Sequence, residues 1–180
     1  MKKLFVPLLL ILALLLGGCA NKNEALFRTF SEELSARSDL DLTAEVRAEY
    51  DDRSCSFTLR CTEDGSGGCT VEVLEPELIR GVRAQLNADG TKLLYDSISV
   101  DTGESGSSLS PMGALPLLLR ALREGALDSL WKEDGCLAVR LVPEDGVGVT
   151  VLFDAGMRPD YAEIDREGKG VLFIDVTEFA

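Results

Sequence analysis

The sequence predicts an α+β domain in which two helices cover an antiparallel β-sheet. From residue 40 onward, most of the chain alternates between apolar and polar residues, which is typical of strands with one buried face. Four Asp-Gly pairs separate several of these runs, and such pairs favour hairpin turns because both residues tolerate positive φ. Only two segments have apolar residues at helical spacing. We therefore expect a meander of eight to eleven strands.

The first 23 residues are expected to direct and anchor the protein. Lys2 and Lys3 precede an apolar run over residues 4–16, which has the length of a signal-peptide core and falls short of the roughly 20 residues that span a membrane. Small residues and Cys19 follow, and this order resembles the bacterial lipobox, whose cysteine carries diacylglycerol after cleavage. An ordinary secretory signal and an uncleaved anchor are the alternatives. We predict a lipoprotein signal peptide over residues 1–18, lipidation of Cys19, a tether over 19–23 and one domain over 24–180.

The mature chain is predicted to be strongly acidic. The net charge of the whole sequence is −13, and it becomes −15 once Lys2 and Lys3 are removed with the signal peptide. Because nucleic acid and anionic lipid headgroups are polyanions, such a surface repels both. We therefore expect no nucleic-acid partner, and we expect the N-terminal lipid to hold the protein at the extracytoplasmic face of the cell membrane.

The predicted domain begins with a helix and continues with long strands. A helix is expected over residues 24–37, where four apolar side chains share one face: Leu26, Phe27, Phe30 and Leu34. Over residues 40–50 the even positions are apolar or aromatic and the odd ones are polar, which predicts a strand with one wet face. The same alternation returns over residues 55–61 and 69–73 on either side of a glycine-rich turn.

Four cysteines remain in the predicted mature chain, namely Cys55, Cys61, Cys69 and Cys136. A hairpin centred on Gly65 would place Cys61 opposite Cys69 on the apolar side of the sheet. A cross-strand disulfide and two buried free thiols fit this arrangement equally well. A zinc site is not expected, because the sequence has no histidine and no CxxC pair.

A second helix is predicted over residues 111–124. Ser110 and Pro111 form a typical helix start, and Gly125 can end the helix. Apolar side chains occupy more than half of its circumference, so the helix needs partners on two sides. It is expected either to be deeply buried or to lie between the sheet and another apolar body.

No set of catalytic residues is visible in the sequence. The absence of histidine removes the Ser-His-Asp and Cys-His types of catalytic site. Most acidic residues fall on polar strand faces or in turns, and no DxDxDG calcium loop is present. We therefore expect a protein that is not an enzyme and that has no metal or cofactor.

The order of these elements resembles a known family. A lipobox, a short helix and long strands are followed by VLEPELIRGVRAQLNADGTKLLYDSISVDTG, which contains Pro76 to Gly81, a hairpin over residues 88–91 and the pair Tyr95-Asp96. This order is similar to that of the LolA/LolB superfamily, to the related mycobacterial LppX/LprG lipoproteins and to GerS-like lipoproteins of spore-forming bacteria. The resemblance implies an incomplete antiparallel β-barrel of about eleven strands, with helices covering its open side and an apolar cavity that takes acyl chains.

Two functions follow from this resemblance. The first is a binding module that holds a lipid or another apolar ligand in the half-barrel. The second is an interaction protein with a solid interior that docks a cell-envelope or spore-cortex enzyme, as the resemblance to GerS implies. No loop is expected to carry the bulky apolar tip with which LolB-like proteins pass on lipid. For the binding module, the predicted lining residues are Leu42, Val46, Phe57, Leu59, Val71, Val73, Val82, Leu86, Leu118 and Leu122.

Overall fold

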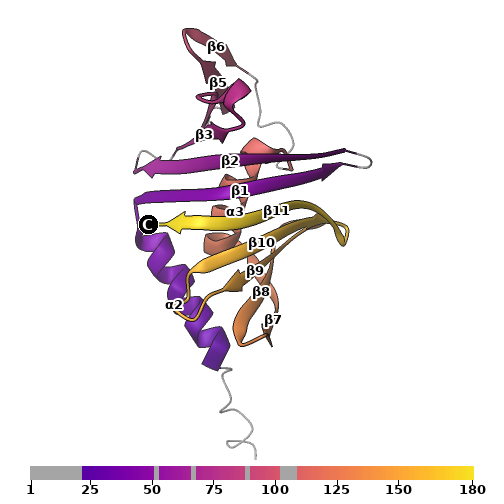
Figure 1. The fold of residues 1–180 in the computed structure, drawn as a ribbon. Coiled ribbons are helices and arrows are strands. Elements are labelled where there is room, and N and C mark those ends of the chain that lie inside the picture. The colour runs from indigo at the N-terminus through magenta and orange to yellow at the C-terminus, as the bar shows by residue number, and fades with distance from the viewer. Residues whose placement is uncertain (1–21, 51–52, 66–67, 88–89, 102–108) are drawn as a thin grey trace, which may run out of the picture.

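A computed structural model describes residues 22–50, 53–65, 68–87, 90–101 and 109–180 (Figure 1). Within them, eleven strands form one antiparallel sheet in the order β6-β5-β4-β3-β2-β1-β11-β10-β9-β8-β7. Two α-helices and one short 3-10 helix complete the fold. The prediction of an α+β fold with an incomplete antiparallel barrel is therefore confirmed.

The sheet consists of an N-terminal and a C-terminal half. The N-terminal half contains β1 (Asp39–Tyr50), β2 (Arg53–Asp64), β3 (Cys69–Glu75), β4 (Arg83–Asn87), β5 (Gly90–Tyr95) and β6 (Ile98–Asp101), with the 3-10 helix η1 (Glu77–Ile79) between β3 and β4. The C-terminal half contains β7 (Ala126–Glu133), β8 (Cys136–Glu144), β9 (Val147–Phe153), β10 (Pro159–Arg166) and β11 (Lys169–Phe179). The two halves meet where β1 pairs with β11, and β6 and β7 form the two free edges.

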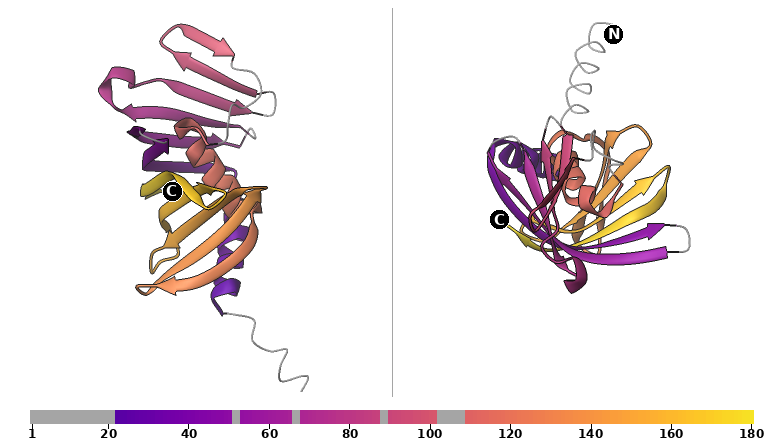
Figure 2. Two further views of the ribbon diagram at one scale, coloured as in Figure 1. Left: turned by 90° about the vertical axis from the view of Figure 1, so that its right-hand side faces the viewer. Right: turned by 90° about the horizontal axis from the view of Figure 1, so that it is seen from above.

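The sheet curves around helix α3 (Pro111–Glu124), as Figure 2 shows. The hydroxyl of Ser110 accepts a hydrogen bond from the backbone N–H of Gly113, and Pro111 occupies the first turn, where its missing N–H costs nothing. The helix lies against β1, β2, β3, β8 and β11 on the concave face of the sheet, and against the first helix on its other side. The prediction of a helix with two apolar sides is confirmed, and its leucines at positions 115, 117, 118, 119 and 122 are buried.

The first helix, α2 (Lys22–Ala36), begins two residues before its predicted start and ends one residue early. Its residues Lys22 and Asn23 were expected in the tether, but neither disfavours a helix and neither belongs to the apolar face that set the prediction. Phe30 packs edge-on against Phe153 of β9 at a centroid distance of 5.0 Å, and against Phe179 of β11 at 6.3 Å. These aromatic contacts hold α2 over the lower part of the concave face. Within the described residues, neither helix is both long and apolar enough to cross a membrane.

The hairpin of β2 and β3 differs from its prediction. Cys61 pairs with Val71, and Cys69 pairs with Glu63, so the two cysteines are diagonal neighbours on one face and not directly opposite. The register of the described pairs moves the centre of the hairpin one position beyond Gly65, so the Asp-Gly pair lies before that centre. By contrast, Asp134 and Gly135 both have positive φ and form the predicted two-residue turn between β7 and β8.

Candidate functional site

One face of the sheet is apolar from its centre to the edge at β6. Paired residues in consecutive strands share a face, and the row that starts at Leu42 of β1 continues through Cys61, Val71, Ala84, Leu93 and Val100. The row is buried as far as Ala84, whereas Val100 is 51% exposed. The core under the helices therefore continues into an apolar surface that the helices do not cover.

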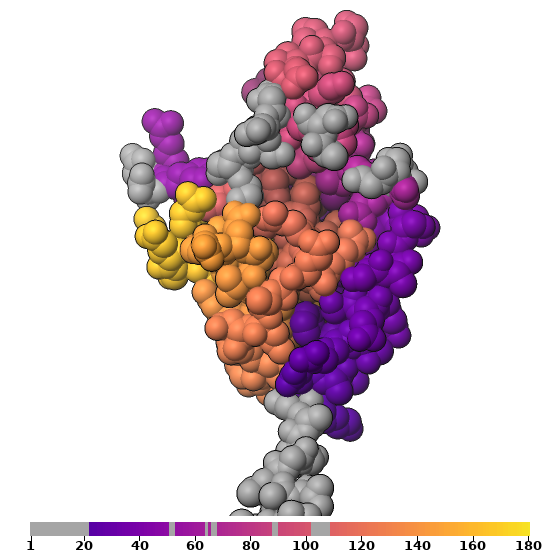
Figure 3. Space-filling model, turned by 180° about the vertical axis from the view of Figure 1, so that it is seen from behind, coloured from indigo at the N-terminus to yellow at the C-terminus, as the bar shows by residue number. Residues whose placement is uncertain are grey.

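We call this uncovered part of the concave face the open end, and we define it by Val82, Leu86, Leu93, Tyr95, Ile98 and Val100. Tyr95 is 49% exposed and Ile98 is 62% exposed, and the two pair with each other across the turn between β5 and β6. Strands β4, β5 and β6 rise clear of both helices at the top of the space-filling view (Figure 3). The opposite faces of the same strands are mostly polar, with Arg83, Gln85, Lys92 and Ser99.

The structure divides the ten predicted lining residues into two groups. Seven are buried in the core between the sheet and α3, namely Leu42, Val46, Leu59, Val71, Val73, Leu118 and Leu122. The other three are half-buried and pack against that core, namely Phe57, Val82 and Leu86. Of these three, Val82 and Leu86 belong to the open end.

Four exposed or half-exposed residues of the open end were missed by the sequence analysis: Leu93, Tyr95, Ile98 and Val100. Their signal is an alternation of apolar and polar residues on either side of Asp96 and Ser97. Asp96 has a φ of 53°, and the chain turns there, so that Ile98 returns beside Tyr95. Only this turn brings the odd-numbered Leu93 and Tyr95 onto the same face as the even-numbered Ile98 and Val100, and the alternation alone does not predict it.

Hydrogen bonds fix the start of α3 beside the concave face. The Tyr50 hydroxyl, at the end of β1, donates a 2.8 Å hydrogen bond to the carbonyl oxygen of Leu109. Burial raises the pKa of Tyr50, and the nearby Cys55 thiol raises it further. The hydroxyl therefore stays protonated as a donor through the physiological range.

An ion pair fixes the other end of α3. Arg123 donates to both carboxylate oxygens of Glu63 on β2, at 2.8 and 2.6 Å, and each side chain is 19% exposed. The Ser31 hydroxyl of α2 also donates to the carbonyl oxygen of Arg123 at 3.3 Å. The hydrogen bonds to the Glu63 carboxylate raise the pKa of the Arg123 guanidinium. This cluster joins α2, α3 and the sheet at one point.

Cys61 and Cys69 lie beside this ion pair. All four cysteines of the described chain are free thiols. A hydrogen bond to Cys69 raises the pKa of the Cys61 thiol, and burial raises it further. Of the two alternatives that the sequence left open, the structure contains the pair of free thiols. Cys19 lies outside the described residues.

One loop contradicts the expectation that no apolar tip is present. Leu78, in η1 between β3 and β4, is 88% exposed. Its neighbour Ile79 instead packs against the core, and the Arg80 side chain donates to the carbonyl oxygen of Leu74 at 2.8 Å. Because Ile79 turns inward, the adjacent Leu78 is directed into solvent. The sequence does not show which of the two residues packs against the core, so it does not show that Leu78 is exposed.

Two grooves that are lined entirely by described residues flank α2. One has a volume of about 360 Å³ and lies between α2 and the turn that joins β9 to β10, with Leu26, Phe30 and Met157 in its lining. The other, of about 280 Å³, lies on the other side of the helix beside Phe27 and Leu127. Within the described part of the chain, no three Asp, Glu or Cys side chains converge into a group that could hold a metal ion.

Comparison of the structure with solved structures identifies its fold. A LolA superfamily protein from Nitrosomonas europaea superposes with a TM-score of 0.52 over 87% of this chain and 91% of its own, at 12% sequence identity. This chain has a LolA-like fold. The resemblance seen in the sequence is therefore confirmed at the level of the fold.

Two further solved structures that match this chain are lipoproteins or contain one. They are the structure of the CwlD amidase from Clostridioides difficile in complex with the GerS lipoprotein (17% identity, 87% of this chain, 94% of that chain, TM-score 0.49) and the lipoprotein LppX from Mycobacterium tuberculosis (13% identity, 89% and 96%, TM-score 0.45). No protein-family model matches the sequence, and no curated protein matches it in sequence.

Proposed function

We propose that this protein is a lipid-anchored lipoprotein of the bacterial envelope that binds an acyl chain, or another apolar ligand, at the open end of its concave face. The observation that carries the proposal is the continuation of the apolar face through β4, β5 and β6 beyond the two helices. Exposed apolar patches that are continuous and rimmed by polar residues mark binding surfaces in soluble domains. The LolA-like fold supports the same function.

The chemistry of the open end favours an apolar ligand. Its defining side chains are aliphatic except for that of Tyr95, and Thr91, which pairs with Leu86 on the same face, adds a second hydroxyl. A ligand with charged or strongly polar groups along its length would lose hydration there without gaining hydrogen bonds. An acyl chain has no such groups, and it gains the full benefit of leaving water.

The proposed anchor follows from the N-terminal sequence. Residues 1–18 act as the signal peptide, Cys19 carries the lipid, and the chain up to the start of α2 connects that lipid to the domain. Since the mature chain has a net charge of −15, the lipid holds the domain at the extracytoplasmic face of the membrane against electrostatic repulsion. The exposed Leu78 gives the domain an apolar contact point for a second lipid surface.

Titration of the domain over residues 20–180 with a fluorescent fatty acid tests the proposed binding. Ile98→Asp and Val100→Asp place a charge in the open end, so each should raise the Kd about 10-fold to 100-fold, which corresponds to the loss of about 1.5–3 kcal/mol of apolar contact. Ser99→Asp adds the same charge on the opposite face, and Leu78→Asp adds it outside the concave face, so both should bind like the wild type.

Equal weakening by Ser99→Asp and Val100→Asp would contradict the proposed position of the ligand. Circular dichroism and urea unfolding of each variant confirm that the sheet is retained.

Docking of an envelope protein is a second candidate function, and the exposure of β6 favours it. All four residues of this edge strand are exposed, and an exposed edge can accept a strand from a partner. Tyr95 and Ile98 close a two-residue turn, so they form a hydrogen-bonded pair. Hydrogen-bonded and non-hydrogen-bonded pairs alternate along a hairpin, so the next pair, Leu94 and Ser99, is not hydrogen-bonded. We therefore expect the N–H of Ser99 to point away from β5. Ser99→Pro should therefore abolish capture of an envelope partner while leaving fatty-acid binding intact. Retained capture by this variant would exclude strand addition at β6.

A further inference from the structure

A groove on the far side of the molecule from the open end has the properties of a second acyl-chain site. It lies between α2 and the turn that joins β9 to β10, and its volume is about 360 Å³, within the range of small-ligand pockets. Ala25, Leu26, Phe30 and Met157 supply its apolar lining, and Lys22, Thr29 and Glu33 supply its polar side chains. Leu26 is 44% exposed although the rest of the apolar face of α2 packs against the sheet. The groove therefore holds apolar surface that the fold leaves in contact with water.

The walls of the groove are rigid. Phe30 is fixed by its ring contacts with Phe153 and Phe179. The opposite wall is a turn held by Asp154, whose carboxylate accepts hydrogen bonds from the backbone N–H groups of Gly156 at 2.7 Å and Arg158 at 2.9 Å. Met157 has a φ of 60° in this turn, so the backbone presents its side chain to the groove in a conformation that non-glycine residues rarely adopt. A preformed groove loses little conformational entropy when a ligand enters it.

The position of the groove indicates which acyl chain reaches it first. One end is lined by Lys22, the first residue of α2, and Lys22 follows Cys19 by three positions. Three residues of extended chain span at most about 11 Å, so a lipid on Cys19 would be tethered at the mouth of the groove. A ligand on so short a tether has an effective concentration on the order of millimolar, far above that of a free lipid in water.

We infer that this groove binds one acyl chain of the lipid carried by Cys19. The inference rests on the proposed lipid anchor, and it adds a site that is separate from the open end. The bound chain covers Leu26, Phe30 and Met157, and the Lys22 ammonium lies beside the ester groups at the mouth. A chain held in the groove is withdrawn from the bilayer, so fewer chains oppose release of the protein from the membrane.

Photo-crosslinking in the full-length lipoprotein tests this inference. Bacteria that produce the protein are fed a diazirine-labelled palmitate, the purified lipoprotein is irradiated in nonionic detergent, and its peptides are mapped by mass spectrometry. The expected crosslinks join the lipid of Cys19 to peptides that contain residues 25–30 and 156–157. Met157→Glu should reduce these crosslinks at least tenfold. Leu127→Glu, in the groove on the other side of α2, should leave them unchanged.

Three results would overturn the inference, and they are distinguishable. Crosslinks that go only to phospholipid, to detergent or to β4–β6 would show that the groove does not hold the chain. Groove crosslinks that persist in the Cys19→Ser variant, fed the same palmitate, would show that the occupant is a free lipid. An N-terminal peptide without lipid mass would show that the proposed anchor itself is wrong, whatever the groove binds.

Discussion

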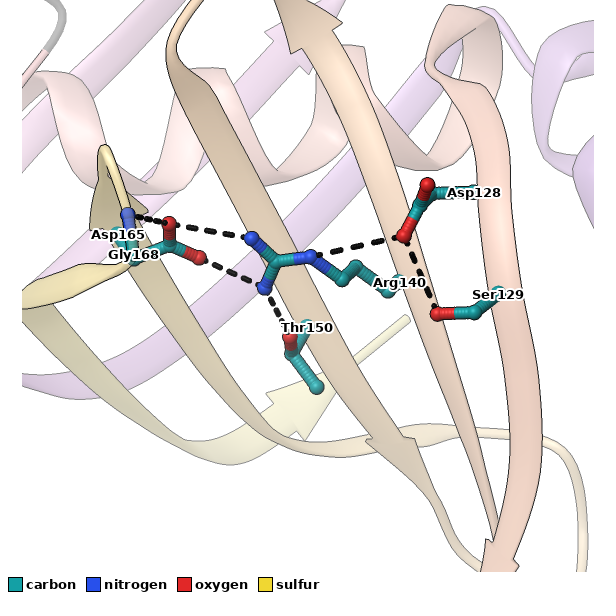
Figure 4. Close-up of polar contacts among 6 residues, drawn as sticks. All are labelled: Asp128, Ser129, Arg140, Thr150, Asp165 and Gly168. Atoms are coloured by element: carbon teal, nitrogen blue, oxygen red, sulfur yellow. Dashed lines mark hydrogen bonds and ion pairs between the residues drawn. The ribbon is translucent and has the colours of Figure 1, made fainter.

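The Arg140 side chain of β8 joins three neighbouring strands on the convex face of the sheet, as Figure 4 shows. It contacts the buried Asp165 carboxylate of β10 at 2.8 and 3.2 Å and the Thr150 hydroxyl of β9 at 3.2 Å, and Asp128 of β7 lies 3.8 Å away. To reach β10 it must pass over Gly148, whose missing side chain leaves the path open: a Cβ there would lie closer than 3.0 Å to both the guanidinium and the Asp165 carboxylate.

Gly148→Ala should therefore destabilise the domain by about 1–3 kcal/mol, the usual cost of overpacking, because the added methyl group separates the buried Asp165 carboxylate from its half-buried partner Arg140. The free energy of unfolding in urea measures this cost. Gly156→Ala is the matched control, since a Cβ at that position comes no closer than 3.2 Å to its nearest neighbour, the Asp154 carboxylate. Equal losses in the two variants would show that the crossing of Arg140 does not depend on Gly148.

The Tyr50 hydroxyl should make stability depend on alkaline pH. Its pKa is raised in the folded state, so the unfolded chain loses this proton first, and the contribution of the hydroxyl is present below pH about 10 and is lost as the pH rises further. Tyr50→Phe should cost about 1 kcal/mol at pH 7 through the lost bond to Leu109. The difference between the wild type and the variant should shrink between pH 9 and pH 11 in urea unfolding. A constant difference over that range would contradict the assigned role.

At the scale of elements, the two arginines of α3 differ in what they stabilise. Arg123 joins the helix to β2 through a largely buried pair with Glu63, whereas Arg120 pairs with Glu144 at a site where its side chain is 46% exposed. Arg123→Met should cost about 1.5–3 kcal/mol of unfolding free energy, and Arg120→Met at most about 1 kcal/mol. A double-mutant cycle with Glu63→Gln separates the pair from the packing of the arginine stem. Similar losses for the two arginines would contradict the proposal that Arg123 locks the end of α3.

The predictability of an element from the sequence depends on whether its signal is local. The bounds of α3 are predictable because Ser110, Pro111 and Gly125 mark its ends and the leucines between them define its buried sides. The pairing of β2 with β3 is less predictable, since a shift of the turn by one residue moves the partner of Cys61 from Cys69 to Val71. The turn at Asp96 and Ser97 contains no Asp-Gly pair, so the split of β5 from β6 gave no strong signal.

At the scale of the whole molecule, alternation predicts which residues share the concave face, but only the three-dimensional arrangement shows how far α3 extends over it. Val71 and Val100 have the same sequence pattern, yet one is fully buried and the other is half exposed. Seven of the ten predicted lining residues lie near the centre of the sheet, where α3 packs against the concave face. The candidate site includes only two of the predicted lining residues, Val82 and Leu86, and it extends from them across β5 to β6.

Native mass spectrometry tests the central claim most directly. The domain over residues 19–180, with Cys19→Ser to remove the anchor, is exported in a bacterial host and purified from the envelope without detergent. We predict a population that carries one lipid-sized adduct, lost in the Ile98→Asp/Val100→Asp double variant and retained in Ser99→Asp. A wild-type domain that carries only its polypeptide mass, and that stays bare after incubation with phospholipid vesicles, would contradict the claim that the open end binds acyl chains.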